Sequence, residues 1–174
     1  KCKGGSDGSF TVVGSGGTPA YRFQIPNRAE QTTGTFSGLS AGSYTVTITD
    51  DNECTNTTTV TVTEPGLLEA GGSTTAVACH GDSTGSLTAT ATGGVGTYEY
   101  SLDGSIFQAS ATFSGQAAGT YTVTVRDENN CTATVELEIT EPGAPVSVAE
   151  DSMTPVKCKG GSDGSFTVVG SGGT

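Results

Sequence analysis

Short stretches in which hydrophobic and polar residues alternate are the dominant pattern along this chain. In residues 120–127, TYTVTVRD, the residues Tyr121, Val123 and Val125 occupy every second position between polar neighbours. Residues 132–140 alternate in the same way with Val, Leu and Ile. A period of two places every second side chain on one face of a strand. Both stretches are therefore predicted to be half-buried β-strands.

The same reading predicts further strands over residues 67–79, 86–92 and 98–102, with two short ones near 106–108 and 112–114. Turns rich in Gly and Asp separate these strands. The composition agrees, because Thr, Val, Tyr and Phe favour strands whereas Gly, at 27 residues, supplies turns. Short alternating strands with frequent turns are typical of a β-sandwich. The chain is predicted to be all-β.

A shift of the chain against itself by 77 residues reveals a repeat. It aligns Cys2 with Cys79, Cys54 with Cys131 and Glu64-Pro65 with Glu141-Pro142. Such self-similarity identifies a tandem array. We expect immunoglobulin-like β-sandwich repeats of about 77 residues: residues 1–65 form a repeat lacking its first strand, 66–142 a complete repeat, and 143–174 the opening strands of a third.

A second shift, of 156 residues, aligns two identical segments. Residues 1–18 and 157–174 both read KCKGGSDGSFTVVGSGGT. Copies two repeats apart are thus more alike than adjacent copies. We infer a parent protein built from duplicated two-repeat units, of which this sequence is a window.

Charge and cysteine content narrow the class of protein. The net charge is −11, so the chain lacks the basic surface that nucleic acids and anionic membranes attract. No apolar run approaches the roughly 18 residues of a spanning helix, so no membrane insertion is expected in this segment. Five Cys at regular positions favour disulfides, and hence secretion.

A Gly precedes a Tyr at the start of the strand near residue 44 and again near residue 121, as AGSY and AGTY. This tyrosine is either the tyrosine corner of immunoglobulin-like sandwiches or an ordinary core aromatic. The sequence leaves both interpretations open.

Four motifs together resemble the SprB repeat. They are C-x-G-G-S-D-G-S, G-G-x-x-x-Y, A-G-x-Y-T-V-T-x-x-D-x-N-x-C and T-E-P, and the segments YTVTITDDNEC and YTVTVRDENNC are the most specific. SprB repeats occur in giant cell-surface adhesins of gliding Bacteroidota. The resemblance implies a secreted adhesin displayed on the cell surface as a filament, with no catalytic residue.

The pairing of the cysteines has more than one solution. In a sandwich, the turn holding Cys79 and the turn holding Cys131 lie at opposite ends of a repeat, too far apart for the Cα separation of under about 7 Å that a disulfide needs. Bonding between repeats, Cys2 with Cys131, is therefore favoured, with Cys54, Cys79 and Cys158 left for neighbouring repeats. A bond within the repeat, Cys2 with Cys54, and free thiols remain alternatives.

Acidic turns raise the possibility of calcium, which takes six to eight oxygen ligands. The candidate ligands are Asp50, Asp51, Glu53, Asp127 and Glu128. Asp and Asn are also ordinary turn residues, and this interpretation is preferred, so no cofactor is expected apart from possible Ca²⁺.

Other candidates are weaker. Ser83 and Ser152 lie in D-S-T and D-S-M sequences that resemble a bacterial O-glycosylation site, and both are expected on loops. His80 is the only histidine and is interpreted as a solvated turn residue. Tyr21, Arg22 and Phe23, or Tyr98 and Tyr100, could form a platform for sugars but are expected to fill the core.

No arrangement of nucleophile, base and orienting group is present, so the chain is predicted not to be an enzyme. We expect a structural or adhesive repeat region of a secreted surface filament, with a role in attachment or gliding. Its partners would be neighbouring repeats of the same chain, further filaments by self-association, and surface polysaccharide. The alternative is a carbohydrate-binding or Ca²⁺-dependent module.

Overall fold

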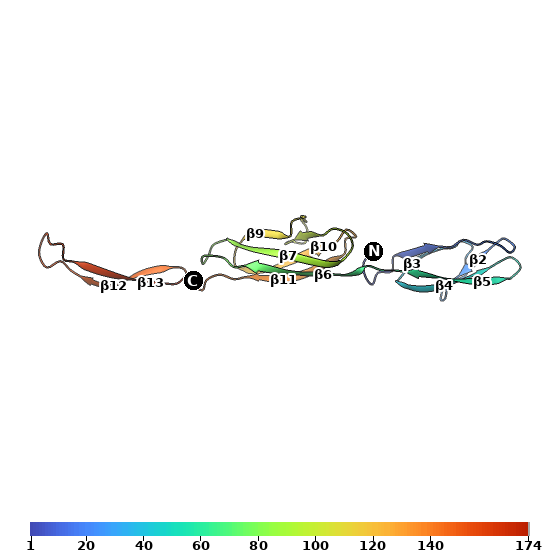
Figure 1. The fold of residues 1–174 in the computed structure, drawn as a ribbon, viewed down its shortest axis with the longest axis horizontal. Coiled ribbons are helices and arrows are strands. Elements are labelled where there is room, and N and C mark those ends of the chain that lie inside the picture. Colours follow the sequence, from blue (N-terminus) through green and yellow to red (C-terminus); the bar gives the residue numbers. More distant parts are fainter. Residues whose placement is uncertain (174) are drawn as a thin grey trace. The chain divides into compact units, whose positions relative to one another are not determined.

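The computed structural model describes residues 1–173, and within that range it contains strands and no helix (Figure 1). None of these residues therefore lies in a helix able to cross a membrane. The chain divides into two compact units. The first comprises Lys1–Glu69, Thr92–Thr97 and Arg126–Thr132; the second comprises Ala70–Ala91, Tyr98–Val125 and Ala133–Thr174. The units depart from the repeat boundaries because the segment around Cys131 lies with the segment around Cys2.

The first unit contains two sheets that carry one repeat. Strands β1 (Gly8–Thr11) and β3 (Thr35–Leu39) pair antiparallel, and β4 (Gly42–Thr49) lies between β2 (Arg22–Gln24) and β5 (Thr55–Val62). The longest pairing, of β4 with β5, runs without a bulge from Gly42 opposite Val62 to Thr49 opposite Thr55. Both strands follow the alternating pattern of the sequence.

The core of this unit lies between its two sheets. Phe36 and Val46 are each 1% exposed and come from different sheets. The ring of Phe10 on β1 lies 5.4 Å from that of Phe36, a distance typical of paired aromatic rings. The remaining buried members are Phe23, Ile25 and Leu39. Burial of one face from each sheet defines a β-sandwich.

The second repeat contains two three-stranded sheets. In one, β7 (Gly85–Gly94) lies between β6 (Gly66–Thr75) and β9 (Thr112–Gln116). In the other, β10 (Gly119–Arg126) lies between β8 (Glu99–Ser101) and β11 (Thr132–Ile139). The predicted inward faces are confirmed, since Leu87, Val123 and Val125 are fully buried whereas the neighbouring Thr122 is exposed. The all-β, immunoglobulin-like sandwich prediction is correct.

One predicted strand is absent from the described residues. Residues 106–108 form no strand; only Gln108 makes an isolated bridge, with Tyr100. The physical reason lies in the preceding turn, where Asp103 Oδ1 accepts 2.8 Å hydrogen bonds from the backbone N–H groups of Ser105 and Ile106. Ser101 Oγ, fully buried, donates to the same carboxylate oxygen over 2.7 Å. These N–H groups therefore form a turn and are not available for strand pairing.

The tyrosine of each repeat is a tyrosine corner. The Tyr44 hydroxyl donates to the Ser40 carbonyl over 2.9 Å, and the Tyr121 hydroxyl donates to the Ala117 carbonyl over 3.0 Å. Both bonds reach back four residues along the chain, as the tyrosine corner requires. This decides between the two interpretations that the sequence left open.

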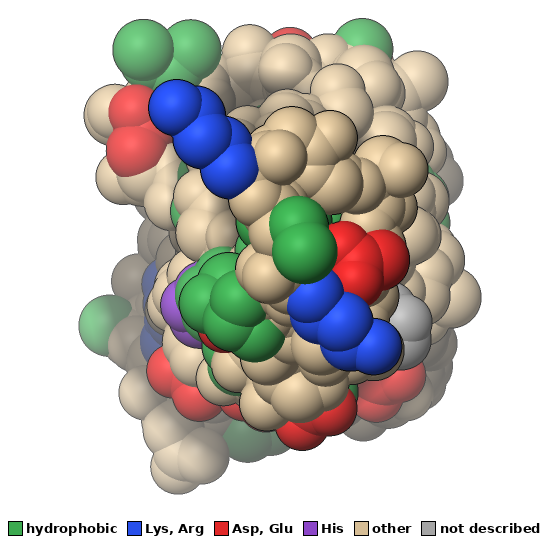
Figure 2. Space-filling view, turned by 90° about the vertical axis from the view of Figure 1, so that its left-hand side faces the viewer, with side chains coloured by type: hydrophobic (Ala, Val, Ile, Leu, Met, Phe, Trp, Pro, Cys, Tyr) green, Lys and Arg blue, Asp and Glu red, His purple; other side chains and the backbone are tan. Residues whose placement is uncertain are grey.

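The last two strands, β12 (Ser147–Thr154) and β13 (Ser165–Ser171), form an antiparallel hairpin. Their register is regular from Ser152 opposite Thr167 to Thr154 opposite Ser165, with a bulge at Asp151. Every residue of both strands is exposed, including Phe166 at 76%. Such uncovered hydrophobic side chains are visible at the surface in Figure 2.

Candidate functional site

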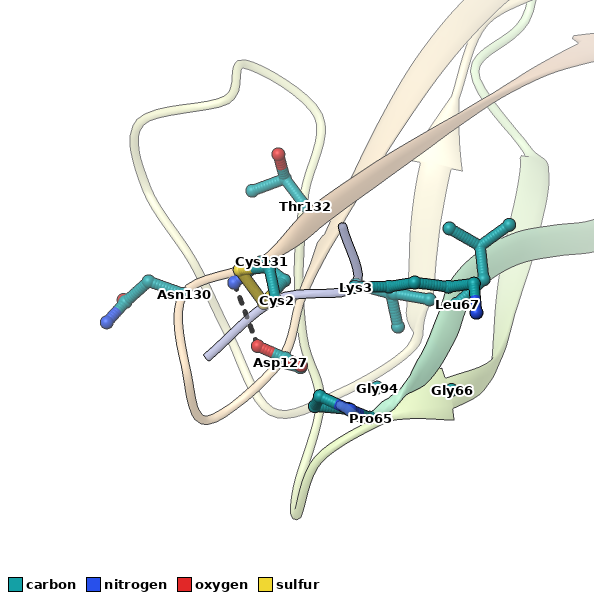
Figure 3. A pocket seen from close by; sticks show the side chains of 11 residues that line it. Cys2, Lys3, Pro65, Gly66, Leu67, Gly94, Asp127, Asn130, Cys131 and Thr132 are labelled. Atoms are coloured by element: carbon teal, nitrogen blue, oxygen red, sulfur yellow. Dashed lines mark hydrogen bonds between the residues drawn. A yellow bond between two sulfur atoms is a disulfide. The ribbon is translucent and has the colours of Figure 1, made fainter. Parts of the chain in front are cut away.

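The most distinctive site in the first unit is the disulfide between Cys2 and Cys131 (Figure 3). The S–S bond measures 2.04 Å and the two Cα atoms lie 5.6 Å apart, although the residues are separated by 129 positions. The bond joins a cysteine of the first repeat to one of the second, which is the pairing favoured from the sequence. Cys54, Cys79 and Cys158 are exposed free thiols.

Cys131 is held by a turn built on Asp127. The Asp127 side chain is only 3% exposed, and its Oδ1 accepts a 2.8 Å hydrogen bond from the Cys131 N–H. Its Oδ2 accepts a 3.0 Å bond from the Val95 N–H. A buried carboxylate that accepts backbone N–H groups fixes the chain around it. Any movement of the chain would leave those N–H groups without a hydrogen-bond acceptor, which costs free energy.

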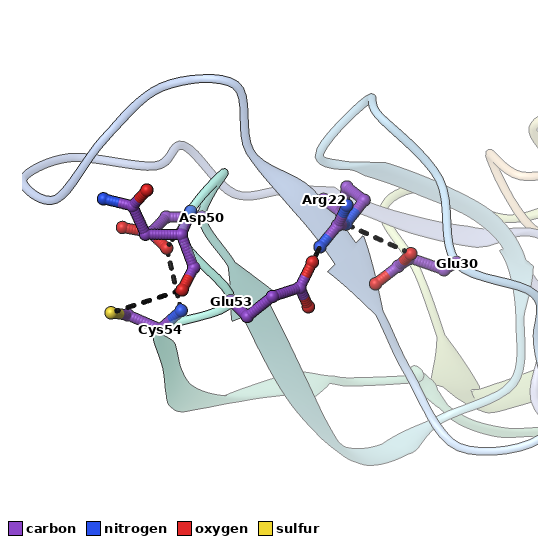
Figure 4. Close-up of polar contacts among 6 residues, drawn as sticks. Arg22, Glu30, Asp50, Glu53 and Cys54 are labelled. Atoms are coloured by element: carbon purple, nitrogen blue, oxygen red, sulfur yellow. Dashed lines mark hydrogen bonds and ion pairs between the residues drawn. The ribbon is translucent and has the colours of Figure 1, made fainter.

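The free cysteine Cys54 lies in an equivalent turn built on Asp50 (Figure 4). Asp50 Oδ1 accepts hydrogen bonds from the N–H groups of Cys54 and Asn52, at 2.8 and 2.9 Å, and Oδ2 accepts one from Thr18 at 2.9 Å. The Thr18 and Cys54 N–H groups hold the pKa of the Asp50 carboxyl below its ordinary value.

Cys2 begins a tight turn that recurs in all three copies. The Gly5 N–H donates to the Cys2 carbonyl over 3.0 Å, and the same bond recurs at Cys79 and Cys158, at 3.1 and 2.9 Å. Gly4 has a φ of +75° in this turn, a conformation that residues with a Cβ rarely adopt. The C-x-G-G sequence is thus explained by the turn that presents the cysteine.

The glutamate of the T-E-P sequence caps this turn. Glu64 Oε2 accepts a 2.6 Å hydrogen bond from the Gly4 N–H, and Oε1 lies 3.2 Å from Lys3 Nζ. The Gly4 N–H, and secondarily Lys3, hold the pKa of the Glu64 carboxyl below its ordinary value. In the second repeat Glu141 accepts the equivalent bond from Gly81 at 2.6 Å. The glutamate therefore fixes the turn of its own repeat.

A shallow cavity of about 290 Å³ adjoins the disulfide (Figure 3). It is lined by Cys2, Lys3, Pro65, Gly66, Leu67, Leu68, Gly94, Asp127, Asn130, Cys131 and Thr132. Pockets that enclose small molecules usually measure roughly 300–1,000 Å³. Both Asp127 oxygens in this cavity already accept backbone N–H groups. We therefore interpret the cavity as part of the structural contact around the disulfide.

The calcium candidates are not brought together. Asp50 and Asp127 direct their oxygens at backbone N–H groups, and Glu53 forms an ion pair with Arg22 at 2.7 Å (Figure 4). Asp51 and Glu128 are both exposed. Among residues 1–173 no group of three or more His, Cys, Asp or Glu could hold a metal ion.

The two glycosylation candidates differ in position. Ser83 lies in an exposed loop, as expected. The expectation of a loop was wrong for Ser152, which lies in β12, where its Oγ is 2.7 Å from the Thr167 hydroxyl. The reason is that β12 pairs with β13 through this position. Glycosylation of either serine stays a prediction.

The histidine and the aromatic candidates have structural positions. His80 Nδ1 lies 2.9 Å from the Pro142 carbonyl oxygen and 3.6 Å from Glu141 Oε1, so it contacts the last residues of its own repeat. Phe23 and Tyr100 are buried in the sandwiches, at 5% and 8% exposure, and are not available as a sugar platform. Tyr21 is half-buried and donates to the Gly16 carbonyl over 2.6 Å.

Sequence reasoning missed the roles of Asp50, Asp127, Glu64 and Glu141 in holding the cysteine turns. Their recurrence at the same spacing was visible in the sequence. Nothing in one sequence, however, distinguishes a carboxylate that accepts N–H groups from one that binds a cation.

The chain thus belongs to the class of tandem-repeat proteins that are built from immunoglobulin-like β-sandwiches, and here a disulfide joins two consecutive repeats. The SprB repeat model matches residues 1–29 and 71–106. The resemblance noted in the sequence is thereby confirmed for the opening half of both repeats. No curated protein matches the chain.

Several solved structures match this chain at low sequence identity and with TM-scores below 0.5. The N-terminal eight immunoglobulin domains of Down Syndrome Cell Adhesion Molecule match 90% of this chain and 24% of theirs, at 15% identity and a TM-score of 0.37. A C-terminal intimin fragment, in complex with the intimin-binding domain of its translocated receptor, matches 82% of this chain and 59% of its own, at 18% identity and a TM-score of 0.37. Domains 4–9 of the surface layer protein SbsC match 80% and 25%, at 18% identity and a TM-score of 0.31. The chain thus spans less than two thirds of each.

Proposed function

We propose that this chain is a structural and adhesive segment of a secreted cell-surface adhesin, without enzymatic activity. Its repeats would act in series as load-bearing modules that hold an adhesive surface away from the cell. The observation that carries the proposal is the Cys2–Cys131 bond, which links the opening turn of the first SprB-type repeat to the Asp127 turn of the second.

The disulfide gives this segment a mechanical property. Tension applied at the two ends of the chain enters near Cys2 and passes directly to Cys131 through the covalent bond. The residues between them, including every strand from β1 to β10, are then excluded from the extensible path. A non-covalent sandwich would otherwise unfold under load and lengthen the adhesin.

The surface chemistry also suits an extracellular filament. The net charge of −11 makes like segments repel and keeps them soluble. The outward faces of β4 and β5 carry mainly threonine, which hydrates readily and leaves no apolar patch on the first repeat's outer sheet. Attachment would then come from many weak contacts along a long chain, for which surface polysaccharide is a suitable partner.

Single-molecule pulling on the chain held at its two ends tests the load-bearing role. The oxidised chain is expected to extend without releasing the 129-position segment closed by the disulfide. Addition of a reductant should release about 450 Å of further contour length, from about 3.5 Å for each freed residue. A Cys54→Ser variant is the control and should behave as the parent.

Two results would refute the proposal. One is an oxidised chain that releases the whole contour length at the same force as the reduced chain. The other is millimolar or tighter binding of a defined glycan by this chain in an array, with saturation at one molecule per repeat, which would indicate a carbohydrate-binding module.

A further inference from the structure

The outer face of strands β4 and β5 in the first repeat is formed by hydroxyl side chains. In the pairing of these strands, Ser43 lies opposite Thr61, Thr45 opposite Thr59, Thr47 opposite Thr57 and Thr49 opposite Thr55. The alternate positions of β4 face the core, as Val46 does at 1% exposure. We call these eight hydroxyl residues the threonine face.

The threonine face is also open in a complete repeat. Thr57 and Thr59 on β5 are exposed, and so are their equivalents Thr134 and Glu136 on β11 of the second repeat. In that repeat the first strand, β6, pairs with β7 in the other sheet and leaves this face uncovered. The exposure of the threonine face is therefore a property of the sandwich.

Most hydroxyl groups of the threonine face have no partner in the described part of the chain. Ser43 Oγ and Thr61 Oγ1 lie 3.4 Å apart, but the other six hydroxyls form no hydrogen bond with any of residues 1–173. The other sheet of the repeat differs, because the Thr11 and Thr35 hydroxyls lie 3.0 Å apart and bond to each other. The threonine face thus presents hydroxyls that are available to a ligand.

The second repeat carries charges where the first carries threonine. By the 77-residue shift, Thr49, Thr59 and Thr61 correspond to Arg126, Glu136 and Glu138. Equal windows of the two repeats show the same contrast. Residues 1–65 contain four Lys and Arg and six Asp and Glu, a net charge of −2, whereas residues 78–142 contain one and eight, a net charge of −7. The threonine face therefore lies on the less acidic of the two repeats.

A neutral polysaccharide matches the threonine face in hydrogen bonding and in charge. Threonine hydroxyls both donate and accept hydrogen bonds, as sugar hydroxyls do. They recur about every 6.7 Å along a strand and about every 4.8 Å between strands, so an extended chain of sugars can contact several at once. A carboxylate on the face would lose hydration when a ligand docked, and this face has none. An acidic polymer, in contrast, would be repelled by the net charge of −11.

A shallow hollow of about 220 Å³ adjoins the threonine face on the side of β2. It is lined by Gln24, Ile25, Pro26, Thr45 and Thr47. Gln24 lies opposite Thr47 in the pairing of β2 with β4, so its amide extends the row of polar groups. The hollow is smaller than the roughly 300 Å³ at which pockets begin to enclose small molecules. It can therefore take a group that projects from a polymer lying across the face, but it cannot enclose a sugar.

We propose that the threonine face of the first repeat binds neutral polysaccharide chains of the extended, β-1,4-linked kind, and that the acidic second repeat does not. The inference rests on the proposed adhesive function, because it assigns the surface through which the segment attaches. Each contact is weak, since a threonine hydroxyl exchanges a hydrogen bond with water for one with a sugar. The strength of attachment then depends on how many such faces act together along a chain of repeats.

Electrophoresis of the full chain in a native gel that contains hydroxyethyl cellulose tests the proposal, because weak binding to an immobile polymer slows migration. The mobility of each protein is compared with its own mobility in a gel without polymer. The parent should be slowed. A double variant, Thr59→Glu with Thr61→Glu, should lose this slowing. It carries the residues that the second repeat has at the equivalent positions, so it is expected to fold.

Two further double variants complete the comparison. Thr35→Glu with Ser37→Glu, at exposed positions of β3 in the other sheet, adds the same charge and should be slowed like the parent. The reverse exchange, Glu136→Thr with Glu138→Thr, gives the second repeat most of a threonine face and should be slowed more than the parent.

Three results would overturn the proposal. They are a parent that hydroxyethyl cellulose does not slow, equal slowing of the variants on β5 and β3, and equal slowing of the parent by carboxymethyl cellulose, which has the same backbone but carries carboxylates. Single-molecule pulling separates these results from a failure of the load-bearing role. A parent that is not slowed in the gel, yet extends fully only after reduction, would lose the binding face and keep the load-bearing function.

Discussion

Asp127 Oδ1 accepts a 2.8 Å hydrogen bond from the backbone N–H of Cys131, the residue whose sulfur is bonded to Cys2. The same bond, at the same length, joins Asp50 to the free Cys54. The turn therefore has one geometry with and without a disulfide. The carboxylate, and not the disulfide, therefore shapes the turn.

Loss of the disulfide is expected to destabilise the chain. A Cys2→Ser substitution frees a loop of 129 positions, which in the chain-entropy treatment lowers the free energy of unfolding by about 4–5 kcal/mol. Denaturant unfolding measures the change, and a reductant should lower the midpoint of the parent but not that of the variant. Cys79→Ser, at an exposed free thiol, is the control; an equal loss there would contradict this role of Cys2.

Acid should destabilise the chain through Asp50 and Glu64. Both carboxyls have a folded-state pKa below the ordinary value, which is about 4 in an unfolded chain. Their contribution is complete above about pH 5, beyond the unfolded-state values, and is lost as the pH falls through the lower folded-state values. Thermal unfolding between pH 7 and pH 2 should show this decline.

The Asp50→Asn variant sharpens the acid measurement. It removes an acceptor of backbone N–H groups, so its midpoint should be lower at pH 7 and should change less on acidification. The exposed Asp51→Asn change is the matched control and should retain the parent's pH profile. An Asp50→Asn variant with the parent's full acid sensitivity would assign that sensitivity to other groups.

The tyrosine corners are expected to contribute measurably. Tyr44→Phe removes the 2.9 Å hydrogen bond to the Ser40 carbonyl but keeps the ring, and should lower the free energy of unfolding by about 1 kcal/mol. Thr45→Val, which removes an exposed hydroxyl from the next position, should have a smaller effect. Urea titrations of both variants would measure the difference, and equal effects would deny the corner a special role.

Two glycines of the same conformation should differ in their tolerance of a methyl group. Gly16 and Gly93 both have a φ of +75°, so replacement by Ala strains each backbone by about 1–2 kcal/mol. At Gly93 the Cβ would also collide with the Leu67 backbone oxygen, whereas at Gly16 it meets nothing within 4 Å. Gly93→Ala should therefore unfold at a clearly lower temperature than Gly16→Ala, and the reverse order would contradict the placement of β6.

Calcium is expected to leave the stability of the chain unchanged. The Asp50 and Asp127 oxygens already accept backbone N–H groups, and a cation there would have to displace them. Thermal unfolding in millimolar Ca²⁺ and in chelator should give the same midpoint. An unfolding midpoint that is several degrees higher in Ca²⁺ than in chelator would instead support a metal site in the acidic turns.

Alternation alone was enough to predict the sandwich. Val123 and Val125 are buried as their spacing indicated, because a strand with one face on a core has only one register that buries its apolar side chains. The repeat shift then transferred each strand to its equivalent in the first copy. The prediction of a strand over residues 106–108 was wrong. Asp103, two residues after the fully buried Ser101, accepts the local backbone N–H groups and so forms a turn in place of a strand. Whether this segment forms a turn or a strand depends on the burial of Ser101, which the hydrophobic pattern of the sequence does not specify.

The candidate site was predictable only in part. Strand directions were sufficient to favour Cys2 with Cys131, since that argument needs only the order of the elements. The carboxylates that hold the two turns were interpreted as turn residues with Ca²⁺ as the weaker alternative, but the N–H groups that they accept were not identified, because Asp50 has the same neighbours in the sequence whether it accepts an N–H group or a cation. Ser152 was predicted to lie on a loop, but it lies in β12, which pairs with β13, a segment identical in sequence to β1 and its continuation.

The Cys2–Cys131 bond also makes the intervening chain a closed ring. A protease that cuts once within the exposed turn at Asp103–Ser105 opens that ring into a line, but the two halves stay attached through the sulfur atoms. After a single cut within the ring, both fragments therefore stay covalently joined. Release of a fragment from within the ring requires a second cut or a reductant. If the chain is displayed outside the cell as proposed, its covalent topology gives it this tolerance of proteolytic damage.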